Sequence, residues 1–223
     1  MNRTDLETYI SETYSVSGEH LFVRYPSFAD CTGLYTIYLP AAVRQIETAA
    51  FRGCDSLVEF NVDSGNMVFC TENGALMTRD RTVFIQLPAD ANYTDYVIPE
   101  TVTRILEGAF YGCHKLYSVT IPGSVSKIEE LTFCGCSGLT EIVIPMSVRT
   151  IRASAFTEKA AEGGEDKMSS TALKKIHYGG LEDWFYSISI GEDNDNLYNA
   201  ALYFVDPWDM PQSVVDYFET QIR

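Results

Sequence analysis

The sequence has few basic residues and no long apolar run. Sixteen Lys and Arg residues stand against 31 Asp and Glu residues, so the formal net charge at pH 7 is −15. Nucleic acids and anionic membrane surfaces repel such a chain, and we expect neither as a partner. No run of about 18 apolar residues is present, which argues against a membrane-spanning helix and against membrane insertion.

Residues suited to catalysis are also scarce. The three histidines are His20, His114 and His177, and none has Ser, Cys and Asp neighbours that suggest a catalytic triad. The glycines do not form a phosphate-binding loop. We therefore predict that the protein is not an enzyme and has no catalytic residue, no cofactor and no metal site.

The opening residues, MNRTDLETYISETY, lack the apolar core of a signal peptide. This absence leaves two expectations open. The protein is cytoplasmic if Met1 is the true start, or it is secreted or displayed on the cell surface and its export signal has been removed.

A sequence repeat organises the chain between Ile98 and Phe156. The same residue types return at one fixed interval: Pro99, Pro122 and Pro145; Val102, Val125 and Val148; Ile105, Ile128 and Ile151; Phe110, Phe133 and Phe156. The interval is about 23 residues, within the range of about 20–29 residues that is typical of a leucine-rich-repeat solenoid.

One repeat shows the physical basis of this prediction. The alternation of polar and β-branched residues from Ser118 to Ile121 predicts a half-buried strand, which Pro122 ends. Val125 and Ile128 predict a short apolar segment on the return path. The block from Phe133 to Leu139 predicts a single helical or 3₁₀ turn. One such unit cannot bury its apolar face alone, so the repeats must stack.

These positions resemble the BspA-like leucine-rich repeats (LRR_5 type) known from bacterial surface proteins. The shared pattern is I-P-x-x-V-x-x-I-x-x-x-A-F-x-G-C-x-x-L-x-x-I-x-I-P, and it covers about residues 28–178. The resemblance implies an α/β, β-rich, right-handed solenoid, or horseshoe, with short helical turns and parallel strands on its concave face. Pro-x-x-Val follows the strand here, so we expect no asparagine ladder.

We predict three regions: an N-terminal cap (1–27), the solenoid (28–181) and an acidic C-terminal cap with a short helix at 212–222 (182–223). The register breaks between Pro40 and Pro99, whose separation is not a whole number of periods. We assign the extra residues to an insertion near 63–97, a β-hairpin that projects from the solenoid edge. A polar segment near 157–171 predicts a loop.

Cysteine placement follows the repeat. Four of the six cysteines occupy the same position of the repeat, which we call a slot: Cys31, Cys54, Cys113 and Cys136. We predict that these four are reduced and buried, because core cysteines behave as small hydrophobes. Cys134 occupies the slot of Arg52 and Tyr111, and we predict that it is exposed.

Three other stretches allow further interpretations. Gly191 to Asn196 could bind calcium, but it lacks the EF-hand spacing and a solvated Asx turn is favoured. Cys134-Gly-Cys136 with Cys113-His114 suggests zinc, which the Cys-x-Cys spacing disfavours. Residues 6–29 resemble the opening of MmcQ/YjbR-like bacterial proteins, but this run is too short to carry a function.

The outward side chains of the strands are the candidate functional surface. Solenoids bind proteins through extended concave faces, and interfaces favour aromatic anchors. The alternative is that this mixed polar surface is only the solvated face of a sheet. The predicted partner-binding residues are Tyr35, Thr36, Tyr38, Glu59, Asn61, Tyr117, Ser118, Thr120, Glu141, Val143, Lys175 and His177.

We therefore expect a non-enzymatic protein-binding module. The resemblance implies a surface or secreted protein that acts in adhesion to host or bacterial surface proteins. An intracellular scaffold is the alternative, which the missing signal peptide favours.

Overall fold

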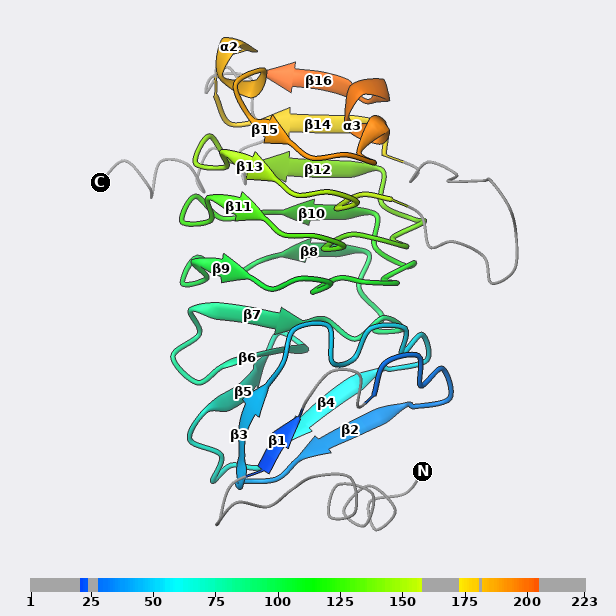
Figure 1. Ribbon diagram of the computed structural model, residues 1–223, viewed down its shortest axis with the longest axis vertical. Helices are drawn as coiled ribbons and strands as arrows, with labels where there is room; N and C mark the ends of the chain where they lie inside the picture. Colours follow the sequence, from blue (N-terminus) through cyan, green and yellow to red (C-terminus); the bar gives the residue numbers. More distant parts are fainter. Residues whose placement is uncertain (1–20, 24–27, 158–172, 181, 205–223) are drawn as a thin grey trace.

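The computed structural model describes residues 21–23, 28–157, 173–180 and 182–204. Within these residues the chain forms a solenoid, whose turns stack along one long axis (Figure 1). This confirms the predicted β-rich repeat fold. The loop predicted after Thr157, the helix predicted at 212–222 and most of the predicted N-terminal cap lie outside the described residues.

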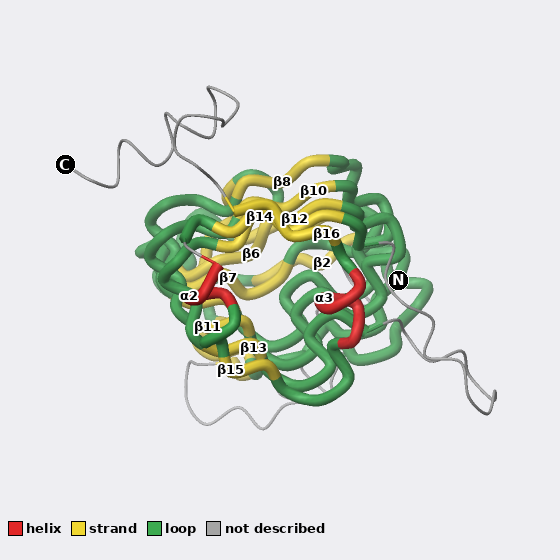
Figure 2. The backbone as a smooth tube through the Cα atoms, turned by 90° about the horizontal axis from the view of Figure 1, so that it is seen from above, coloured by secondary structure: helices red, strands yellow, loops and turns green. Residues whose placement is uncertain are grey.

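Five parallel strands form a sheet along one side of the solenoid (Figure 2). We call it the long sheet. In spatial order they are β16 (Ala201–Phe204), β14 (Lys175–Tyr178), β12 (Glu141–Ile144), β10 (Ser118–Thr120) and β8 (Asp95–Val97). Shorter return strands lie on the other side: β9 (Arg104–Ile105), β11 (Lys127–Ile128), β13 (Thr150–Ile151) and β15 (Ser189–Ile190). The long-sheet strands form one column and the return strands form a second column. Strands within a column are parallel, because every turn brings the chain back in the same direction.

The repeat period sets the register of both columns. Val119 pairs with Ile142 and Lys127 pairs with Thr150, in each case one period further along the chain. Equivalent slots of successive repeats therefore lie side by side. As a result, the apolar slots meet in a continuous interior, where Val119, Ile142 and Ile151 are fully buried.

A ladder of aromatic rings runs through this interior. Phe110 stacks on Phe133 and Phe133 stacks on Phe156, with ring centroids 5.1 Å apart in each pair. Phe84 extends the ladder with a centroid 4.8 Å from that of Phe110. Offset stacking at this distance adds to the stabilisation that burial of the rings provides.

The segments between return strands and long-sheet strands are separate turns. The Cys113 amide donates to the Phe110 carbonyl at 3.1 Å, and the Leu116 amide donates to the Cys113 carbonyl at 3.3 Å. Gly112, with φ of 74°, interrupts any helical run between these bonds. In the described residues, α-helix is confined to α2 (Glu182–Phe185) and α3 (Asp195–Asn199).

The stack extends into both regions that the sequence assigns to caps. At the N-terminal end, β1 (Leu21–Val23) pairs in parallel with β3 (Val43–Ile46). At the other end, β15 pairs with β13 and β16 pairs with β14, so residues 182–204 add a further turn. Phe185 and Ile188 of this turn are buried and close the core at this end.

The inserted segment forms part of the solenoid. Its strand β6 (Ala75–Thr78) pairs antiparallel with both β5 (Phe69–Glu72) and β7 (Val83–Gln86), and β7 pairs in parallel with β9. Met77 and Phe84 are fully buried in the core. The prediction that this hairpin projects from the edge is therefore wrong, because its apolar residues can be buried only inside the stack. The hairpin separates β2 (Thr36–Leu39) and β4 (Glu59–Val62) from the long sheet.

All six cysteines are thiols, and three of the four in the repeat slot are buried as predicted. The Cys54 and Cys136 thiols each donate at 3.0 Å to the carbonyl of a phenylalanine in the preceding turn, Phe28 and Phe110. The prediction is wrong for Cys31, which is exposed because no earlier turn stacks over it among the described residues.

The predicted exposure of Cys134 is also wrong. This side chain is buried, because Thr157 of the following turn lies against it with its Oγ1 3.6 Å from the Cys134 Sγ. The slot is therefore covered by the next repeat even though earlier repeats place larger, partly exposed side chains there.

Buried asparagines complete the backbone bonding where the period stops. Before the insertion, the Asn66 amide group donates to the carbonyls of Pro40 and Val43 at 2.9 and 3.1 Å. Its Oδ1 accepts from the amides of Val68 and Phe69 at 2.9 and 2.8 Å. Asn66 therefore supplies the donor and acceptors that a following repeat would provide.

Asn194 has the same role at the end of the stack. Its Nδ2 donates to the Arg152 carbonyl at 2.8 Å, and its Oδ1 accepts from the Phe156 amide at 3.2 Å. Asn196 donates to the Phe156 carbonyl at 2.6 Å, and both asparagines are buried. The segment from Gly191 to Asn196 is thus a structural cap, and the solvated turn favoured by the sequence is wrong for its asparagines.

We predict that Asn194→Ala lowers the free energy of unfolding by about 2 kcal/mol, since it leaves buried backbone groups without partners. Urea denaturation measures the change. Asp195→Ala, at an exposed position in the same segment, is the control and should change it by about 0.5 kcal/mol or less. Equal losses for the two variants would contradict the capping role.

We predict that Tyr178→Phe does not destabilise the protein and raises the free energy of unfolding by about 1 kcal/mol. Tyr178 is fully buried and its hydroxyl has no hydrogen-bond partner among the residues that the structure describes, so its desolvation is uncompensated there. Thermal and urea denaturation test this, with Tyr203→Phe at an exposed position as the control. A clear loss of stability in Tyr178→Phe would show that its hydroxyl is bonded in solution.

Candidate functional site

The outward side chains of the long sheet form one continuous surface, which we call the sheet face. Strand register places them in two rows. The first row is Asp95, Ser118, Glu141, Lys175 and Ala201, and the second is Val97, Thr120, Val143, His177 and Tyr203. The rows bring together six of the residues that the sequence singles out.

The remaining predicted residues, apart from Tyr117, do not belong to this surface. Thr36 pairs with Glu59 and Tyr38 pairs with Asn61 in the separate sheet of β2 and β4, and Tyr35 immediately precedes β2. These two strands are inclined to those of the long sheet (Figure 1). The insertion therefore divides the predicted surface into two parts.

Four sheet-face residues were missed from the sequence: Asp95, Val97, Ala201 and Tyr203. A signal for the first two was present, because they precede Ile98-Pro99 as Ser118 and Thr120 precede Ile121-Pro122. No proline occupies the equivalent position after β16. Its residues, Ala-Leu-Tyr-Phe, also lack an alternation of polar and apolar side chains, so the sequence carries no clear signal for Ala201 and Tyr203.

Glu141 is the centre of a polar network on the sheet face. The Lys175 Nζ lies 2.5 Å from its Oε1, and the Tyr117 hydroxyl donates to the same oxygen at 3.2 Å. The His177 Nε2 lies 3.7 Å from its Oε2. The hydrogen bond from Lys175 lowers the pKa of Glu141, and the same contact raises the pKa of Lys175. This network joins side chains from β12 and β14 to Tyr117, which immediately precedes β10.

Aromatic side chains flank the network. The His177 ring stacks on Tyr203 with centroids 5.2 Å apart and planes inclined by 20°. Tyr117 and Tyr203 are 48% and 47% exposed, so each offers half of its surface to a partner. Exposed tyrosines held by neighbouring contacts are typical of protein interfaces, because they lose little conformational entropy on binding.

The described residues contain no group of three His, Cys, Asp or Glu side chains able to hold a metal ion. Two of the residues considered for zinc lie in different environments. Cys113 is buried, whereas His114 is exposed and lies beside Asp90, with its Nε2 3.5 Å from Oδ1. No helix in the described part of the chain is long and apolar enough to cross a membrane.

A family model described as BspA type leucine rich repeat region matches the chain in six copies, over residues 16–73 and 88–177. The chain belongs to this family. The unmatched residues between the two ranges contain all of β6 and β7. No comparison supports the resemblance of residues 6–29 to MmcQ/YjbR-like proteins, and the repeat match begins inside that run. No curated protein matches the sequence.

A solved leucine-rich-repeat structure shares the fold. A leucine-rich repeat protein from Eubacterium ventriosum is 24% identical with a TM-score of 0.53, and the match covers 65% of this chain and 36% of that protein. The pneumococcal vaccine antigen PcpA is 17% identical with a TM-score of 0.48, covering 81% and 61%. The chain thus spans about a third of the first protein and less than two thirds of the second.

We predict that the pKa of the Glu141 carboxyl is below the ordinary range and returns towards it in Lys175→Met. The stabilisation from this ion pair is present at neutral pH and is lost as the pH falls through the lowered pKa. Carbon-detected NMR titration of Glu141 measures both values. Lys174→Met, at an exposed neighbouring position, should leave the pKa low, and a low value in Lys175→Met would assign the shift to another cause.

Proposed function

We propose that this protein is a non-enzymatic protein-binding module and that the sheet face is its binding surface. The observation that carries this proposal is the register of the long sheet, which aligns outward side chains from five turns in two rows. A ligand on this face touches several repeats at once. Family membership supports the coarser statement that the chain is an interaction module.

The chemistry of the rows favours a protein ligand. Five strands about 4.8 Å apart extend over about 19 Å, which suits a protein surface better than a small molecule. The rows combine carboxylates at Asp95 and Glu141, a cation at Lys175, and the aromatic rings of His177 and Tyr203. This mixture suits a polar protein surface with both signs of charge. The net charge of −15 disfavours nucleic acid.

We also propose that the protein is displayed at a bacterial surface, where it binds host or bacterial surface proteins. This proposal rests on membership of the BspA-type family. It is consistent with an extended sheet face that binds a protein without catalysing a reaction.

The test begins with capture of binding proteins from a panel of host extracellular matrix proteins by the immobilised chain. For a captured protein, Tyr117→Ala combined with Tyr203→Ala should weaken binding by about tenfold or more, since exposed aromatic anchors carry much of the binding energy. The melting temperature should stay unchanged, because neither side chain is buried.

The matched control combines Tyr186→Ala with Tyr198→Ala. These tyrosines are 66% and 67% exposed and lie outside the sheet face. Their removal should leave affinity unchanged. If the control pair weakens binding as much as the first pair, the sheet face is not the binding surface.

A further inference from the structure

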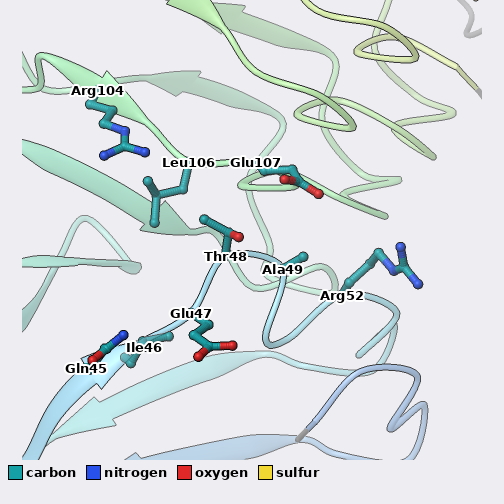
Figure 3. A pocket seen from close by; sticks show the side chains of 9 residues that line it. All are labelled: Gln45, Ile46, Glu47, Thr48, Ala49, Arg52, Arg104, Leu106 and Glu107. Carbon is teal, nitrogen blue, oxygen red and sulfur yellow. The ribbon is translucent and has the colours of Figure 1, made fainter. Parts of the chain in front are cut away.

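A cleft of about 300 Å³ separates the return strands β9 and β11, and we call it the return cleft. Both of its walls belong to regular repeats that are one period apart. Arg104 lies on one wall, and it also borders a larger cleft on the side of the insertion (Figure 3). The residues that line the return cleft are Thr103, Arg104, Ile105, Ser126, Lys127 and Glu129.

The hydrogen-bond ladder of the return strands is interrupted at this cleft. At the next junction, the amides of Arg149 and Arg152 donate to the carbonyls of Ser126 and Ile128, each at 2.9 Å. The equivalent amides one period earlier are those of Ser126 and Glu129, and neither donates to any residue in the described part of the chain. No strand pairing joins β9 to β11 there. Both unbonded amides therefore belong to residues that line the cleft.

Two cations face each other across the gap. Arg104 and Lys127 occupy the same slot of successive return strands. At the neighbouring junctions this slot pairs a cation with an uncharged residue, or two uncharged residues: Val83 with Arg104, Lys127 with Thr150, and Thr150 with Ser189. Like charges at facing positions of neighbouring strands are destabilising. The ladder is thus missing at the junction where the facing side chains repel each other.

Nearby carboxylates do not neutralise this pair. Arg104 makes no ion pair with any residue that the structure describes. The Lys127 Nζ lies 3.7 Å from one oxygen of Glu129, whose other oxygen lies 3.8 Å from the Arg152 Nε. Glu129 is the one carboxylate among the lining residues, and it is shared between two cations. The return cleft therefore keeps an excess of positive charge, although the whole chain carries −15.

We propose that the return cleft binds a tetrahedral oxyanion, the sulfate or phosphate group of a ligand, between Arg104 and Lys127. One wall supplies the Arg104 guanidinium, and the other supplies the Lys127 ammonium group and the amides of Ser126 and Glu129. The oxygens of a tetrahedral anion point in different directions and can accept from both walls at once, whereas a carboxylate presents its oxygens in one plane. Two facing cations also match a doubly charged group.

This site is separate from the sheet face, because it lies among the return strands on the other side of the solenoid. The proposal for protein binding and the proposal for oxyanion binding can therefore fail independently. Sulfate esters and phosphate esters share the same anion chemistry, so the two inorganic ions are the probes.

The first test is a titration of the uniformly ¹⁵N-labelled full chain with sodium sulfate, and separately with sodium phosphate, at an ionic strength held constant with sodium chloride. The amide resonances of Ser126 and Glu129 should shift in a saturable manner, with a dissociation constant on the order of 1–10 mM. The amides of Arg149 and Arg152 are already bonded and should not shift. Saturation with either ion supports the proposal. Absence of saturable shifts with both ions up to 50 mM, about five times that upper limit, overturns it.

Charge-removing variants test the location of the site. Lys127→Gln should weaken sulfate binding by about tenfold or more, because one of the two facing cations is lost. Its melting temperature without sulfate should not fall, since the change also removes the like-charge pair. Lys174→Gln is the matched control: it removes the same charge at an exposed position next to β14 and should leave sulfate binding unchanged. Arg104→Gln is a second test variant if Lys127→Gln lowers the melting temperature. Equal sulfate affinity in the test and control variants overturns the proposal.

Sodium acetate separates an oxyanion site from a carboxylate site. At the same ionic strength, acetate should bind at least about tenfold more weakly than sulfate, because it carries one charge and its oxygens reach fewer donors. Acetate that shifts the amides of Ser126 and Glu129 with equal or higher affinity would make the cleft a carboxylate site and overturn the proposal.

Discussion

The backbone groups of each turn must bond to those of the next turn, and the rest of this structure depends on that constraint. The amides of Phe110 and Phe133 donate to carbonyls of the following turns at 2.9 and 2.8 Å. A buried amide without a partner costs about 1–3 kcal/mol, so every turn needs a neighbour in register. The aromatic ladder and the buried valine and isoleucine rows are possible only because this bonding holds the turns at a fixed separation.

The constraint is most visible where the repeat stops. Asn66 and Asn194 place a side-chain amide where the next turn would have placed its backbone, and both are buried for that reason. The hairpin of β5 to β7 solves the same problem with a strand, because β7 pairs with β9 and carries Phe84 into the aromatic ladder.

The same stacking gives the molecule its candidate binding surface. Parallel register lines up outward side chains in rows, so Glu141 meets Lys175 and His177 from the neighbouring strand and Tyr117 from the preceding turn.

The sequence by itself determined the period, the strand positions, the apolar slots and the rows of Ser118, Thr120, Glu141 and Val143. Residues that are one period apart must become neighbours when successive turns stack. It also indicated that Cys113 and Cys136 are buried. Only the tertiary structure decided how the period ends. The burial of Asn194, the exposure of Cys31, the integration of the hairpin and the separation of Tyr38 and Asn61 from the long sheet all depend on which neighbour is missing. Periodicity predicts what a residue meets inside the repeat, but the partners at a break come from distant residues whose spacing follows no period.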